Sequence, residues 1–166
     1  MVSQVAKRIA LSIAEYAACY IIFTIMTVPL HEWVHLSLAR MLGGDGYIVA
    51  TPFGALTVLT KIPEHFYLVA FSGGIFTAIV YLILFIWDVH DNDVEEYCSI
   101  IPLITSQLGY GVFEGMFVAS MPMDAFISWG TVVLIVCWGI GMLASLCTLI
   151  YHLRQIVLKN AENTGR

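Results

Sequence analysis

The sequence predicts an all-α protein that crosses a membrane several times. The chain has 166 residues, of which 60% are hydrophobic and only 11% are charged, whereas soluble domains carry about 25% charged residues. Four long apolar segments follow one another, separated by glycine, proline or charged residues. We therefore expect about four transmembrane helices with a short β-hairpin after the first. Residues 1–166 should form a single membrane-embedded domain without a separate soluble domain.

The first apolar segment covers about residues 9–42 and ends at the breaker residues 43–46. A straight helix of this length would measure about 50 Å, whereas the hydrocarbon layer is about 30 Å thick. The helix must therefore be tilted, kinked or broken, and Pro29 is the obvious place. Lys7 and Arg8 precede the segment, as in a signal peptide, but the apolar run is too long and no cleavage site follows it. We expect a retained first helix.

The next segment, residues 47–60, is rich in β-branched and aromatic residues and is interrupted by Pro52 and Gly54. This pattern predicts two short strands or a hairpin. Open strand edges are not tolerated against lipid, so the hairpin should lie at the membrane interface or line a protein cavity.

Three further apolar segments cover about residues 66–87, 97–119 and 126–153. Proline and glycine interrupt the middle one. The last is the cleanest membrane span, and its small residues permit close helix packing. The connection at residues 88–96 is acidic and should be solvated.

Composition also limits the partners and the compartment. The net charge is −5, and no basic patch gives reason to expect nucleic acid. The chain contains four scattered cysteines, which we interpret as buried thiols: Cys19, Cys98, Cys137 and Cys147. Most basic residues lie near the two ends of the chain, which places the termini of this integral membrane protein on the cytoplasmic side.

The motif His31-Glu32-Trp33-Val34-His35 lies inside the first apolar segment. On a helix, its two histidines lie one turn apart on the same face, where both can bind one zinc ion. Glu32 is free to act as a general base on a zinc-bound water. Ionisable groups in hydrocarbon mark functional sites because they are energetically costly there. The motif therefore predicts His31 and His35 as metal ligands and Glu32 as the catalytic residue.

A zinc ion bound by two histidines needs a third protein ligand and leaves a fourth position for water. The candidates are Glu114, Asp45, Asp124, His65, His90 and His152. Only Glu114 lies within an apolar segment, where flanking glycines let another helix approach closely. The two aspartates lie in predicted loops and the three histidines at predicted interfaces. Glu114 is therefore the expected third ligand.

These motifs resemble those of the site-2 protease family of intramembrane zinc metalloproteases. Residues 31–44 resemble the family's HExxH helix, and residues 71–78 resemble its small-residue motif, although Gly74 stands where the family usually has proline. The family's third motif ends in Asp-Gly, and Glu114-Gly115 matches it in position and order. The asparagine and proline that normally precede this aspartate are absent, but Gln107 and Tyr110 lie nearby.

The resemblance spans roughly residues 20 to 120 and implies a minimal, divergent member of that family. It implies a zinc metallo-endopeptidase with one zinc ion per chain that hydrolyses peptide bonds of membrane-spanning proteins. The strands at residues 47–60 would hold an unwound substrate segment. Two alternatives stay open. One is a non-catalytic membrane protein of the same fold that binds metal or a partner helix. The other is a membrane zinc protease that trims prenylated or soluble termini.

Overall fold

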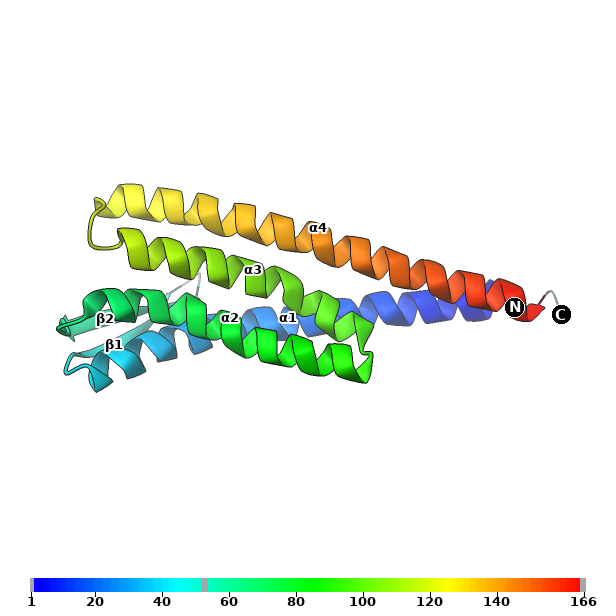
Figure 1. Cartoon of the computed structure of the whole chain (residues 1–166), viewed down its shortest axis with the longest axis horizontal. Helices are drawn as coiled ribbons and strands as arrows, with labels where there is room; N and C mark the ends of the chain where they lie inside the picture. Colours follow the sequence, from blue (N-terminus) through cyan, green and yellow to red (C-terminus); the bar gives the residue numbers. More distant parts are fainter. Residues whose placement is uncertain (1, 52–53, 165–166) are drawn as a thin grey trace.

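The computed structural model of the chain describes residues 2–51 and 54–164 (Figure 1). Its elements are α1 (Val2–Met41), β1 (Asp45–Thr51), β2 (Gly54–Lys61), α2 (Phe66–Asp91), α3 (Val94–Phe117) and α4 (Met123–Thr164). The helical architecture is confirmed, and so is the hairpin after the first helix. α1 begins and α4 ends at the same end of the molecule, and the hairpin lies at the other end (Figure 1).

Three helices in the described part of the chain, α1, α2 and α4, are long and apolar enough to cross a membrane. This indicates a membrane protein. The fourth expected span is confirmed only as a helix, because α3 is not among the three helices that are long and apolar enough to cross a membrane. α3 packs against α1, α2 and α4, and it buries polar side chains such as Ser99, Ser106 and Gln107 within the bundle. Its polar residues therefore face other helices.

Helix α1 continues through Pro29 without a break, so interruption of the helix at this proline is not observed. Its 40 residues correspond to about 60 Å, so α1 is longer than the hydrocarbon layer is thick. The helix ends in a glycine motif, in which Gly43 has a φ of +79°. The Gly44 N–H donates to the Ala39 carbonyl at 2.8 Å and the Gly43 N–H donates to the Arg40 carbonyl at 3.1 Å.

The hairpin pairs β1 and β2 antiparallel, with Ile48 opposite Thr57. Residues 52 and 53, including the expected turn residue Pro52, lie outside the described residues. The Arg40 guanidinium joins α1 to β1, because it donates to the Asp45 carboxylate at 3.2 Å and to the Gly46 carbonyl at 3.0 Å. The pKa of Asp45 lies below its ordinary value, mainly because the carboxylate accepts a hydrogen bond from the Gly46 N–H. The hydrogen bond from Arg40 is the next largest cause. The hairpin is thus attached to the end of the motif helix.

The acidic connection is shorter than expected, because α2 extends to Asp91 and α3 begins at Val94. Asn92 ends α2 in a left-handed conformation, and the Asp93 carboxylate accepts a hydrogen bond from the Glu96 N–H at 3.2 Å. The expectation of a solvated segment is wrong for Asp88, which lies in the last turn of α2 and is only 7% exposed. Both helices continue into this segment, and their packing buries the side chain.

All four cysteines are free thiols. Their expected burial is confirmed for Cys98, which packs between Tyr16 and Leu149, but is wrong for Cys147, which is exposed. Cys147 belongs to α4, which is long and apolar enough to cross a membrane and most of which is not buried inside the bundle. A thiol on such a surface can face lipid, so an apolar setting in the sequence does not require burial in protein.

Exposed aromatic side chains mark two levels along the bundle. Tyr67 and Trp87 lie near the two ends of α2, and Trp129 and Tyr151 lie a similar distance apart on α4. The helical rise separates the first pair by about 30 Å and the second by about 33 Å. Tyrosine and tryptophan concentrate at membrane–water interfaces, and the hydrocarbon layer is about 30 Å thick. We infer that these residues mark its two edges.

Candidate metal centre

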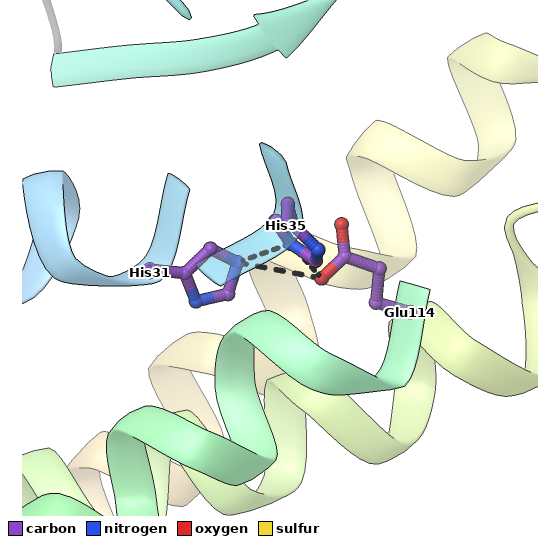
Figure 2. Close-up of side chains that lie close together, drawn as sticks. All are labelled: His31, His35 and Glu114. Atoms are coloured by element: carbon purple, nitrogen blue, oxygen red, sulfur yellow. Dashed lines mark hydrogen bonds and ion pairs between the residues drawn. The ribbon is translucent and has the colours of Figure 1, made fainter. Parts of the chain in front are cut away.

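Three ionisable side chains meet where α1 crosses α3 (Figure 2). His31 and His35 extend from successive turns of α1, and Glu114 reaches them from α3. The two Nε2 atoms lie 2.9 Å apart. Glu114 Oε2 lies 3.4 Å from His31 Nε2 and 3.3 Å from His35 Nε2. Within the described residues this is the one group of three or more histidine, cysteine and acidic side chains whose arrangement could hold a metal ion.

The outer nitrogens of both imidazoles are engaged by oxygen atoms. His35 Nδ1 lies 2.7 Å from the Val69 carbonyl oxygen of α2, and His31 Nδ1 lies 2.8 Å from Gln107 Oε1 of α3. A carbonyl oxygen accepts hydrogen bonds only, so each Nδ1 carries the proton. In the neutral imidazoles each Nε2 therefore presents a lone pair towards the other ring and towards Glu114. Histidines that bind metals are usually oriented in this way.

Three electron-rich atoms that face one another repel unless a proton or a metal ion lies between them. Glu114 Oε2 is buried and has no hydrogen-bond partner. A tetrahedral zinc ion with bonds of about 2.0–2.1 Å has ligand atoms about 3.3–3.4 Å apart. The observed separations of 2.9, 3.3 and 3.4 Å are close to these values. The three residues therefore fit a metal ion of this geometry.

Gly73 of α2 lies directly against the two imidazoles. A Cβ atom at this position would collide with His35 Nε2 and would lie 2.7 Å from His31 Nε2. The next residue, Gly74, lies against the backbone of Gly111 instead, where a Cβ atom would lie 2.5 Å from its Cα. The small-residue motif thus has two uses. Gly73 makes room for the histidines, and Gly74 lets α2 and α3 approach closely.

Gly73→Ala should weaken metal binding by about tenfold or more, because the methyl group displaces the coordinating nitrogens while the helix itself tolerates alanine. The measurement is a competitive zinc titration of the purified protein. Gly139→Ala is the matched control, since a Cβ atom at Gly139 meets nothing within 4 Å. Equal zinc affinity in the two variants would show that Gly73 does not shape the site.

The other proposed ligands lie elsewhere in the described structure. Asp45 pairs with Arg40 at the start of β1, and His152 pairs with Glu95 at 3.4 Å. His65 precedes α2, His90 lies in its last turn, and Asp124 lies in the first turn of α4. None of these joins the two motif histidines.

Glu32 makes a contact that the sequence did not predict. Its Oε2 accepts a hydrogen bond from the Thr57 N–H of β2 at 2.6 Å, and the Thr57 hydroxyl donates to the Glu32 carbonyl at 2.9 Å. Glu32 is not part of the three-residue group. The strand therefore lies directly beside the motif helix, and Glu32 joins the two. A hydrogen bond between residues this far apart in the sequence has no local signal.

Two polar residues noted near Glu114 also lie at the site. Gln107 orients His31 through its side-chain oxygen, as described above. The ring of Tyr110 lies 6.0 Å from that of His31 between centroids. The sequence indicated that these polar residues lie on the same face of α3 as Glu114. It did not indicate that Gln107 binds His31.

Comparisons with protein-family models, with curated proteins and with solved structures found no match to this chain. The resemblance to site-2 proteases therefore rests on the sequence motifs alone.

Proposed function

We propose that this chain is an intramembrane zinc metalloprotease that hydrolyses peptide bonds of membrane-spanning proteins. The observation that carries the proposal is the meeting of His31, His35 and Glu114, whose potential ligand atoms lie within 4.8 Å of one another. Buried ionisable groups in a membrane protein are costly without a partner, and one zinc ion would satisfy all three. Bound there, zinc would act as a Lewis acid that polarises a peptide carbonyl and lowers the pKa of water.

Glu32 is the proposed general base. Its Oε2 is occupied by the Thr57 N–H, which leaves Oε1 to take a proton from the attacking water. The same oxygen would then transfer the proton to the leaving amine. The Thr57 hydrogen bond restricts the rotation of the carboxylate, and such positioning favours proton transfer.

The outer edge of β2 is the proposed substrate-binding element. Backbone N–H groups alternate in direction along an antiparallel strand, and the Thr57 N–H points to Glu32 and away from β1. Ala55, two residues earlier, presents its backbone on the same outer edge. An unwound substrate could pair with this edge by strand addition and so bring a peptide bond close to Glu32. A helical substrate must unwind first, because its own hydrogen bonds cover its backbone.

Proline at Ala55 should reduce cleavage while leaving zinc bound, because it removes an N–H from the outer edge and is tolerated near the start of an edge strand. Proline at Leu56 or Val58 should instead disrupt the hairpin, because the backbone N–H groups of these residues point towards β1. The measurement is cleavage of one substrate by each variant, together with its zinc content. Full activity of Ala55→Pro would assign this edge to structure alone.

One observation favours a second candidate, a metal-binding membrane protein without hydrolytic activity. The Glu32 carboxylate binds the hairpin through Thr57, and this contact alone gives Glu32 a purely structural use.

The direct test of the proposal is a cleavage assay in liposomes with a panel of single-pass membrane proteins. The proposal expects cleavage that a chelator abolishes and added zinc restores. A zinc-loaded, folded protein that leaves the whole panel intact would support the second candidate.

A further inference from the structure

A second polar site lies at the opposite end of the bundle. A cavity of about 350 Å³ opens between the first part of α1, the start of α3 and the last part of α4. Its polar lining consists of Arg8, Ser12, Glu15, Glu95, His152 and Lys159. Along α1, Ser12 lies about 28 Å from His31. The cavity is therefore separate from the metal centre and does not depend on the proposed function.

The inner part of the cavity carries a carboxylate that is already oriented. The Ser12 hydroxyl, which is nearly buried, donates a hydrogen bond to Glu95. His152 Nε2 lies 3.4 Å from the same carboxylate, whose side chain is 14% exposed. Three helices thus hold Glu95 in one position. An ammonium group is the natural ligand for such a carboxylate.

The rim carries charge of both signs. Arg8, Glu15 and Lys159 line the cavity and are exposed. None of the ion pairs found among the described residues involves these three side chains. Two cations favour a phosphate, whereas the carboxylates of Glu15 and Glu95 favour an amine. A ligand that carries both groups matches the lining better than a simple anion.

The position of the cavity along the bundle indicates whether it faces the lipid tails or the lipid headgroups. His152 follows Tyr151, one of the exposed aromatic residues that mark the edge of the hydrocarbon layer. Leu11 and Ile156 add apolar walls beside the charged groups. A polar cavity with apolar walls at this level faces lipid headgroups.

We propose that this cavity binds a zwitterionic amine–phosphate group, of the kind carried by phosphatidylethanolamine. The amine would lie against Glu95 and Glu15, and the phosphate would lie between Arg8 and Lys159.

The test uses native mass spectrometry of the full chain in detergent. It is titrated with dioctanoyl phosphatidylethanolamine, phosphatidylglycerol and phosphatidylcholine, and separately with free phosphoethanolamine and inorganic phosphate. We expect phosphatidylethanolamine to bind about fivefold more tightly than phosphatidylglycerol, which lacks the cation of one exposed ion pair. It should also bind more tightly than phosphatidylcholine, whose quaternary ammonium has no N–H to donate to Glu95 or Glu15. Tight binding of free phosphoethanolamine would also support the site and would identify a soluble source. Equal binding of all three lipids, or inorganic phosphate binding as well as phosphoethanolamine, would overturn the proposal.

Two variants of exposed rim residues keep the test independent of folding. Glu15→Gln should remove the preference for phosphatidylethanolamine over phosphatidylglycerol, because two cations then remain opposite one carboxylate. Arg8→Gln should weaken the binding of both phosphatidylethanolamine and phosphatidylglycerol about fivefold. Glu64→Gln and Lys61→Gln are the matched controls, because both residues are exposed and lie at the other end of the bundle, Lys61 at the end of β2 and Glu64 just after it. Unchanged lipid preference in Glu15→Gln would contradict the assignment.

Discussion

Glu32→Gln should retain zinc and the fold but lose hydrolysis. Glutamine keeps a side-chain oxygen that can accept the Thr57 N–H, so the contact between α1 and β2 survives. The amide cannot take a proton from water, and loss of a general base typically slows a reaction by ~10²–10⁴-fold. The measurement is the rate of substrate cleavage in liposomes, with zinc content and thermal unfolding measured on the same preparation.

Glu32→Ala is the informative companion, because it removes both the base and the anchor of β2. If Glu32 serves only as an anchor, Glu32→Gln should remain as active as the wild type and only Glu32→Ala should lose stability. If Glu32 is the base, both variants lose activity and only the alanine variant also loses the side-chain hydrogen bond to the Thr57 N–H. Equal cleavage by wild type and Glu32→Gln would exclude the proposed mechanism.

Removal of the metal should lower the thermal stability of the folded protein. A ligand that binds only the native state at a thousand times its Kd stabilises it by about 4 kcal/mol, which corresponds to roughly 10 °C in Tm for a chain of this size. Without the ion, the two Nε2 atoms and Glu114 Oε2 remain close together and unshielded. We therefore expect a strong chelator to lower Tm and added zinc to restore it.

The His31→Ala, His35→Ala double variant provides the control for this effect. It should contain almost no zinc, and the chelator should no longer change its Tm. A chelator effect of the same size in this variant, or unchanged zinc content, would remove the site as described.

Much of this structure follows from local signals in the sequence. The apolar segments predict α1, α2 and α4, and the glycines after Met41 predict the end of α1. The β-branched run predicts the hairpin. The spacing of His31 and His35 places both on one face of a helix, and the apolar setting of Glu114 distinguishes it from five other candidates. Each of these inferences depends on residues that are close in the chain.

The remaining features depend on packing between distant segments. The Glu32–Thr57 and His31–Gln107 hydrogen bonds join residues that no sequence period connects. The burial of Asp88 results from how closely α2 and α3 follow one another. The hydropathy of the α3 sequence is lowered by its polar residues, but hydropathy does not show that other helices cover these residues. Three-dimensional contacts were needed for all of these.

The most direct test of the metal centre is the zinc content of wild type, Glu114→Asp and Glu114→Ala, purified in parallel. Glu114 is the proposed ligand that comes from another helix, so its loss tests whether α1 and α3 share one ion. The predicted result is about one zinc per chain in the wild type, partial retention with aspartate and near-complete loss with alanine. Full zinc content in a folded Glu114→Ala variant, or none in the wild type after zinc loading, would contradict a site formed by His31, His35 and Glu114.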